Sequence, residues 1–197
     1  MNIISDSLDE GYFYHIYNRG INGCSIFENE NNYVFFLEKF NKYLSEFVDV
    51  YAYCLLKNHF HLLIKVKSVD LTFTKGQNFD KGLHSENSIV SKQFAKFISS
   101  YSQAYNKQNQ RHGALLESPF KRKRIQTEDY LKNVIIYIHL NPKEAGLKYE
   151  SYKFSSYYGI ISNFKTKLAK TETIELFDDL ENFIFTHKNQ PKFDFNF

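Results

Sequence analysis

The sequence predicts an α+β domain built on a mainly antiparallel sheet, with helices packed on one face of the sheet. Short apolar segments of strand length alternate with segments whose apolar residues recur at helical spacing. Their order is strand, helix, strand, strand, helix, strand, helix, which favours this class. With 197 residues, the chain is long enough for one domain with a real core. One face of its sheet is left for a functional site.

The first half of the chain contains three predicted strands and one helix. Residues 13–18 form a strand that runs into a turn at residues 19–23. Residues 29–47 carry apolar side chains at helical spacing, which predicts an amphipathic helix. Residues 48–55 form the second strand, and a tight turn leads back into the third, residues 59–66, as a hairpin.

The second half opens with a polar segment, residues 68–90, which predicts a long loop. A second helix over residues 90–106 and a short strand over residues 120–125 follow. We expect residues 1–147 to form the core of the domain. Residues 148–197 are then a C-terminal extension that packs on this core and is mainly helical.

The third predicted helix is defined by its ends. Thr127 is a suitable N-cap, and the helix is expected to run to about Leu140 and to end before Pro142. Pro142 then begins one more turn, which Gly146 stops. A last helix is predicted over residues 171–187.

Composition limits the class of protein. No segment approaches the ~20 apolar residues of a membrane-spanning helix, and the N-terminus lacks the basic and apolar regions of a secretory signal. Cys24 and Cys54 are too few for a disulfide framework or a cysteine zinc site, and both are interpreted as ordinary thiols. We therefore expect a cytoplasmic protein without a membrane partner. The net charge of +3 decides little about other partners.

Arginine is scarce in this chain: four of the 25 basic side chains are arginines and the others are lysines. An arginine can therefore mark a place where the planar guanidinium is needed, as for phosphate, although a basic run is often only a solvated face. Residues 121–124 form a basic run in which lysine and arginine alternate. Along a strand the two kinds of side chain take opposite faces, and we expect Arg122 and Arg124 to be the pair that contacts phosphates. The candidate phosphate-binding residues are Arg19, Arg111, Lys121, Arg122, Lys123 and Arg124.

Two histidines one residue apart, His59 and His61, open the third predicted strand. Residues i and i+2 of a strand share a face, so these imidazoles project together while the apolar residues between and after them face the core. Two such imidazoles can hold one metal ion. The alternative is a pair of histidines with no shared task, because this spacing often occurs by chance.

Tyr137 and Asn141 lie one turn apart on the third predicted helix, beside its buried stripe of Leu131, Val134, Ile135 and Ile138. An asparagine carbonyl can supply the oxygen ligand that a two-histidine site still needs. A tyrosine one turn earlier then lies close to the metal. Taken individually, Tyr137 is better explained as an ordinary half-buried helix aromatic and Asn141 as an ordinary N-cap.

Together these residues and several further segments resemble one family, the single-tyrosine HUH transposases. Within it, the chain is most similar to the REP-associated tyrosine transposases and their small insertion-sequence relatives, over roughly residues 11–187. It departs from them at Lys57, where relatives often have proline, and in the longer segment 68–90. The matching segments are Asn58-His59-Phe60-His61-Leu62-Leu63, Tyr137-Ile138-His139-Leu140-Asn141-Pro142, Ala145-Gly146-Leu147, Tyr14-His15, Asn18-Arg19-Gly20, Ile26-Phe27, His112-Gly113, Phe120-Lys121 and Phe154-Ser155-Ser156-Tyr157.

The resemblance implies a ferredoxin-like single domain whose active site lies on the sheet face opposite the helices. It implies that His59 and His61 are metal ligands, that Asn141 is the third ligand, and that Tyr137 is the nucleophile. The ion would be Mg²⁺ or Mn²⁺ at the scissile phosphate of single-stranded DNA, where it stabilises developing charge. Tyr137 would remain joined to the 5′ phosphate, so that a second 3′-OH could join new ends without ATP.

The implied partners are single-stranded DNA ends that contain hairpins, in the bacterial cytoplasm and associated with the nucleoid. A homodimer is compatible with the sequence. Two other functions stay open beside an active transposase. One is a domesticated protein that binds hairpin nucleic acid without cutting it, and the other is a hydrolase whose histidine pair activates water without any need for Tyr137.

Overall fold

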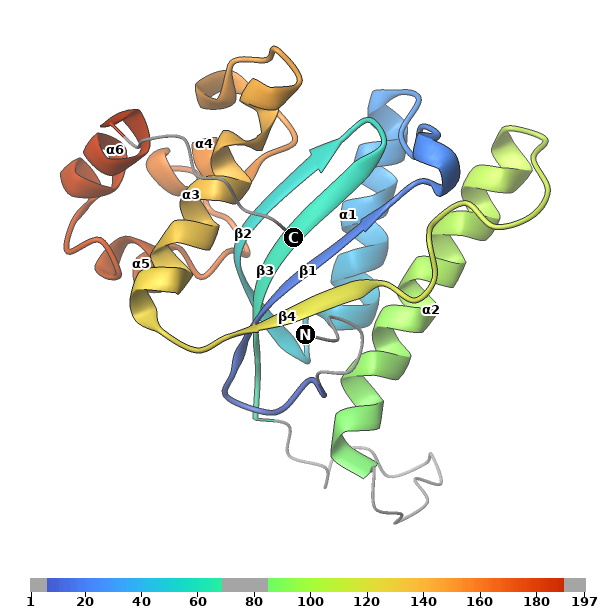
Figure 1. Ribbon diagram of the computed structural model, residues 1–197, viewed down its shortest axis with the longest axis horizontal. Helices are drawn as coiled ribbons and strands as arrows, with labels where there is room; N and C mark the ends of the chain where they lie inside the picture. The colour runs from blue at the N-terminus through green and yellow to red at the C-terminus, as the bar shows by residue number, and fades with distance from the viewer. Residues whose placement is uncertain (1–6, 69–84, 190–197) are drawn as a thin grey trace.

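The computed structural model of the chain describes residues 7–68 and 85–189, so most of the segment predicted as a long loop lies outside the described residues. Its strands form one antiparallel sheet in the order β2-β3-β1-β4. With one helix between β1 and β2 and another between β3 and β4, this is the ferredoxin-like arrangement. The predicted α+β fold is thus confirmed (Figure 1). The strands are β1 (Phe13–Arg19), β2 (Val48–Leu56), β3 (His59–Val66) and β4 (Lys121–Ile125).

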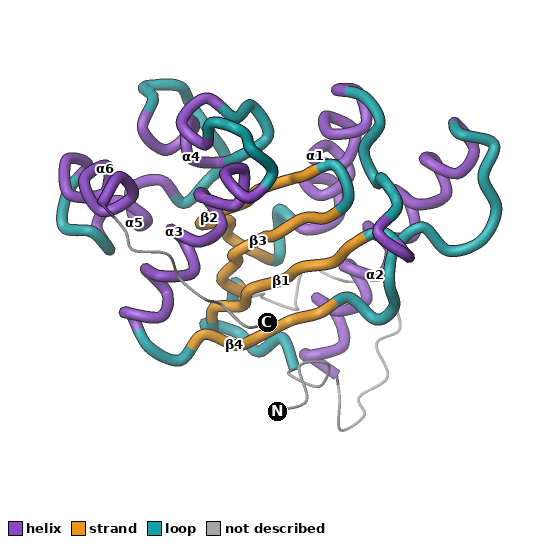
Figure 2. The backbone as a smooth tube through the Cα atoms, turned by 45° about the horizontal axis from the view of Figure 1, so that its top comes forward, coloured by secondary structure: helices purple, strands orange, loops and turns teal. Residues whose placement is uncertain are grey.

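Two long helices, α1 (Glu30–Leu44) and α2 (Ser85–Gln108), cover one face of the sheet (Figures 1 and 2). Asn29 caps α1, since its side chain accepts a hydrogen bond from the backbone N–H of Asn32. The apolar stripe predicted for each helix is buried or half-buried against the sheet. Its members are Tyr33, Phe36, Leu37, Phe40, Tyr43, Leu44 and Phe47, and then Phe94, Phe97, Ile98 and Tyr101.

The second face of the sheet is not left free as the sequence suggested. The helix α3 (Glu128–Glu144) lies across it and packs on β2 and β3, with its predicted stripe buried. Ile136 and His139, on another side of α3, are buried as well, because the C-terminal helices cover them. These helices are α4 (Ser156–Ile161), α5 (Lys170–Glu175) and α6 (Leu180–Asn189), and the short 3-10 turns are Ile21–Gly23 and Tyr149–Ser151.

The expected end of α3 before Pro142 was wrong. Thr127 caps the helix as predicted, but the helix continues through Pro142 to Glu144. In this last turn, proline removes only one hydrogen bond, and Pro142 is buried. The carbonyl of Pro142 accepts the N–H groups of Ala145 and Leu147, and Gly146, with φ of 71°, ends the helix in the left-handed conformation.

The single helix predicted over residues 171–187 is divided in two. The chain breaks between α5 and α6, where Asp178 has φ of 70° and Phe177 is buried beside Phe183. The Asp179 side chain accepts the backbone N–H of Asn182, so it caps α6 as an N-cap aspartate does. Apolar spacing continued across this break, which is why the pattern alone did not show it.

A buried hydrogen-bonded chain joins α3, α4 and α6. His187 Nδ1–H donates to the carbonyl of Phe183 at 2.7 Å, which leaves its Nε2 to accept Nδ1–H of His139 at 2.9 Å. Nε2 of His139 then accepts the hydroxyl of Ser156 at 2.8 Å. This arrangement requires both imidazoles to be neutral. Burial lowers the pKa of His187 to about 4, with Lys143 acting in the same direction, and lowers that of His139 well below its ordinary value.

We expect acid to destabilise the fold through these two histidines. In the unfolded chain they bind protons near their ordinary pKa of 6.5, whereas folded His187 does so only near 4. The unfolded state therefore binds more protons in this window, and the free energy of unfolding falls as the pH drops from 7 to 4. For His187 the loss is about 3 kcal/mol. Urea unfolding at several pH values measures it, and the double variant His139→Leu/His187→Leu should show a shallower pH dependence.

Candidate active site

The histidine pair lies on the face of β3 that α3 covers. Phe60, Leu62 and Ile64 alternate with the pair and are buried in the core under α1 and α2, which confirms the predicted alternation. The rings of His59 and His61 have centroids 5.3 Å apart and are nearly perpendicular. The pair is less open to solvent than expected, since His61 is only 6% exposed.

His59 is held by two asparagines from different elements. Its Nδ1 lies 2.7 Å from Oδ1 of Asn58 in the hairpin turn, so the Nδ1–H donates there. Its Nε2 lies 3.2 Å from Oδ1 of Asn141 on α3. Burial lowers the pKa of His59, although the hydrogen bond with Asn141 acts in the opposite direction. The imidazole is therefore neutral and has its Nε2 lone pair available at neutral pH.

His61 is positioned by a third histidine that the sequence analysis did not assign to the site. Nε2 of His15, a fully buried residue of β1, lies 2.9 Å from Nδ1 of His61. Burial, aided by Lys123, lowers the pKa of His15 to about 3, so it stays neutral. The signal was in the sequence: His15, Tyr17 and Arg19 share one face of β1, and Tyr17 lies opposite His61.

The helix α3 brings Tyr137 and Asn141 to the histidines, as predicted. The Tyr137 ring lies 5.4 Å from the His61 ring, centroid to centroid, and 6.1 Å from the His15 ring. Burial raises the pKa of Tyr137, whereas its hydrogen bond with Asn141 lowers it. The phenol is therefore protonated at neutral pH. Asn141 is 1% exposed and lies inside the helix, so it is not the N-cap considered from the sequence.

The donor set suits a divalent ion. His59 Nε2 and Asn141 Oδ1 lie 3.2 Å apart, and the buried amide nitrogen of Asn141 has no hydrogen-bond partner. An imidazole nitrogen and an amide oxygen are both atoms that can coordinate a divalent ion. Among residues 7–68 and 85–189, no three His, Cys, Asp or Glu side chains gather in a way that could hold a metal. A cation held by the two histidines could take the amide oxygen of Asn141 as a further ligand.

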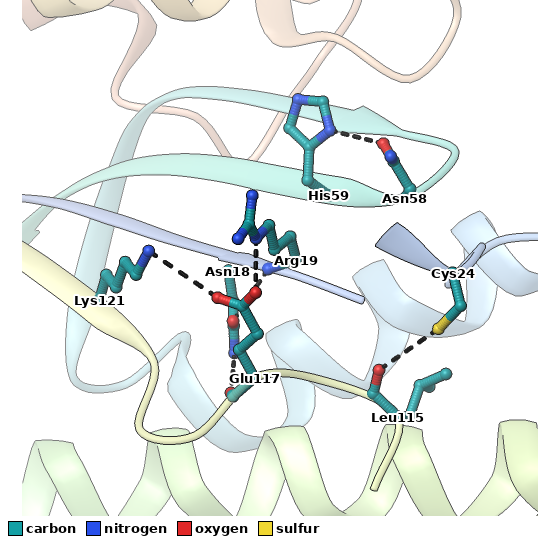
Figure 3. A network of polar contacts seen from close by, with 8 residues as sticks. All are labelled: Asn18, Arg19, Cys24, Asn58, His59, Leu115, Glu117 and Lys121. Carbon is teal, nitrogen blue, oxygen red and sulfur yellow. Dashed lines mark hydrogen bonds and ion pairs between the residues drawn. The ribbon is translucent and has the colours of Figure 1, made fainter. Parts of the chain in front are cut away.

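Arg19 and Lys121 lie on the same sheet face as the histidines. Arg19 is directly opposite His59 on β1, and Lys121 pairs with Tyr17, which in turn lies opposite His61. Both cations contact Glu117: the Arg19 Nε lies 2.5 Å from one carboxylate oxygen and the Lys121 Nζ lies 3.8 Å from the other (Figure 3).

The basic strand β4 divides its charges between the two faces of the sheet. Lys121 and Lys123 face the histidines, as the register with Tyr17 and His15 shows. Arg122 and Arg124 face the other side, where Arg122 donates to the Ser91 hydroxyl of α2 and Arg124 lies 3.5 Å from Asp9 and over the Tyr12 ring. The arginine pair that the sequence analysis favoured for phosphate contact is therefore not the pair beside the histidines.

Arg111 lies apart from these strands, in the loop after α2. Its guanidinium donates to Asn106 and to the carbonyl of Ala114, contacts that brace this loop.

Within the described part of the chain, no helix is long and apolar enough to cross a membrane.

Comparison with known proteins shows a similarity of fold to a solved structure. Neither the models of known protein families nor the curated proteins contain a match to this sequence. A solved structure described as a REP-associated tyrosine transposase bound to a REP hairpin is similar, with a TM-score of 0.61 and 13% sequence identity. The superposition covers 83% of this chain and 87% of that chain. At this identity the likeness establishes a shared fold, which is the fold that the resemblance in the sequence implied.

Proposed function

We propose that the chain is a DNA transposase that nicks single-stranded DNA beside hairpins and transfers strands through Tyr137. One observation carries the proposal: α3 presents Tyr137 and Asn141 to the pair formed by His59 and His61. These are the residues that the sequence resemblance singled out, and they meet in a fold shared with a transposase solved on a DNA hairpin. The proposed partner is accordingly single-stranded DNA with hairpin ends.

His59, His61 and Asn141 would hold Mg²⁺ or Mn²⁺. When bound, such an ion polarises a phosphoryl oxygen and stabilises the charge that develops during attack. The chain prepares the ligands for this role. Burial keeps both imidazoles neutral, which is the form that binds a cation. The contacts of His59 with Asn58 and of His61 with His15 fix the ring orientations, as partners of metal-binding histidines commonly do.

Tyr137 would act as the nucleophile. Its hydroxyl oxygen forms a bond to the scissile phosphorus while the bond to the 3′ oxygen breaks, which gives a 5′-phosphotyrosine and a free 3′-OH. The phenol proton passes to the departing 3′ oxygen, directly or by way of water. Because the pKa of Tyr137 is raised, this proton must leave during attack rather than before it. Attack by a second 3′-OH restores the tyrosine and joins the new ends.

The decisive experiment is a search for a covalent protein–DNA adduct. The chain is incubated with end-labelled hairpin oligonucleotides and Mn²⁺, denatured, and separated by electrophoresis. We expect a labelled protein band that survives denaturation. Cleavage without this band would indicate a hydrolase that activates water, and binding without cleavage would indicate a non-cutting hairpin-binding protein.

We propose that the lysine pair of β4 contacts DNA phosphates next to the active site. Replacing Lys121 and Lys123 with glutamine should flatten the dependence of log affinity on log salt by about 1.4 units, roughly 0.7 for each single-strand phosphate. The matched control replaces Arg122 and Arg124, which carry the same charge on the opposite face. Titration of a labelled oligonucleotide at several salt concentrations measures both slopes. A larger change in the arginine variant would place the DNA on the α2 face instead.

A further inference from the structure

Glu117 is fixed by its backbone at the end of β1. Its N–H donates to the carbonyl of Arg19 at 2.9 Å, and its carbonyl accepts the side-chain amide of buried Asn18 at 2.9 Å. Leu116, the residue before it, forms a bridge with Gly20. The backbone of Glu117 is therefore held in place beside the end of β1, and its side chain lies next to Arg19 and Lys121 (Figure 3).

From this position the carboxylate joins two cations that lie on the same face of the sheet as the histidines. One oxygen contacts Arg19 at 2.5 Å and the other contacts Lys121 at 3.8 Å. Arg19 lies opposite His59, and the Lys121 ammonium lies over the Tyr17 ring, which is stacked beside His61. A phosphodiester also presents two oxygens that share one negative charge, so it can contact the same two cations.

We infer that Arg19 and Lys121 form a phosphate-binding clamp, and that Glu117 is an internal anion which the DNA backbone must displace from it. This inference rests on the proposed function and describes how the protein limits its own affinity for DNA at the same site. The side chains of Arg19 and Lys121 are 64% and 40% exposed, so an incoming phosphate can reach them.

The exchange is physically easy. Exposed ion pairs contribute little stability, and a phosphate of single-stranded DNA replaces the carboxylate with a charge of the same sign and size. The carboxylate therefore lowers affinity for every strand that makes this contact, by the same factor whatever else the strand engages.

The test is the affinity of Glu117→Gln for a labelled single-stranded oligonucleotide, measured by fluorescence anisotropy in EDTA so that metal-dependent steps do not contribute. Glutamine keeps the shape and removes the charge. We expect an affinity about threefold to fivefold higher at low salt. We also expect a salt dependence steeper by roughly 0.7 units of slope, the value for one more phosphate contact. Glu117→Ala, made alongside, should show the same gain.

Two controls separate the local effect from net charge. Glu38→Gln makes the same charge change at an exposed position of α1, which covers the other face of the sheet, and should leave affinity nearly unchanged. In the double variant Arg19→Gln/Glu117→Gln, the gain from removing Glu117 should largely disappear. Unchanged or weaker binding by both Glu117 variants, with normal binding by the unsubstituted chain, would overturn the inference alone. If no chain binds DNA, the proposed function falls with it.

Discussion

Tyr137→Phe should abolish the covalent protein–DNA adduct, a loss of at least about a thousandfold in adduct yield. Phenylalanine keeps the ring that packs against His61 and His15, and removes only the oxygen that would bond to phosphorus. Affinity for hairpin DNA should therefore stay within a few-fold of that of the unsubstituted chain. Denaturing electrophoresis measures the adduct, and anisotropy with the same oligonucleotide measures the affinity.

Tyr130→Phe is the matched control. Tyr130 lies two turns before Tyr137 on α3, is also half-buried, and has the Lys123 ammonium over its ring. Its replacement should leave the adduct in place. Undiminished adduct in Tyr137→Phe, together with its loss in Tyr130→Phe, would move the nucleophile to Tyr130. Adduct in both variants would remove both tyrosines from consideration.

The sheet and its histidine face could be predicted because strand alternation is a local property. Each apolar residue of β3 between and after the histidines had to face a core, which placed both imidazoles on the other side. The start of the third helix could also be predicted from a local signal, because Thr127 caps it. Spacing by one turn was then enough to place Asn141 close to Tyr137.

The parts that could not be predicted depend on contacts between distant segments. Which face of β4 meets the histidines is set by its register with β1, and nothing in a lysine-arginine run reveals that register. His15 joins the site only because β1 pairs with β3. The continuation of α3 through Pro142 follows from burial under segments that come later in the chain, which here outweighs the local preference to end.

His59→Ala and His61→Ala should each weaken Mn²⁺ binding by at least about a hundredfold and eliminate metal-dependent cleavage, whereas Asn141→Ala should cost about tenfold. An imidazole contributes more to a transition-metal site than a neutral amide oxygen, which water can partly replace. Isothermal calorimetry of the metal-free chain measures the affinity independently of catalysis. Exposed His112, outside the site, provides the control variant His112→Ala, which should bind Mn²⁺ normally.

His15→Ala tests the support of this site rather than a ligand. The variant leaves Nδ1 of buried His61 without its partner at 2.9 Å, so the ring loses its fixed orientation. Loss of such a partner typically costs about 10- to 100-fold in metal affinity. His15→Gln offers an amide that can reach the same nitrogen and should recover part of the loss, which a merely structural role would not explain. Normal Mn²⁺ binding in the double variant His59→Ala/His61→Ala would refute the metal site, because Asn141 alone cannot hold the ion.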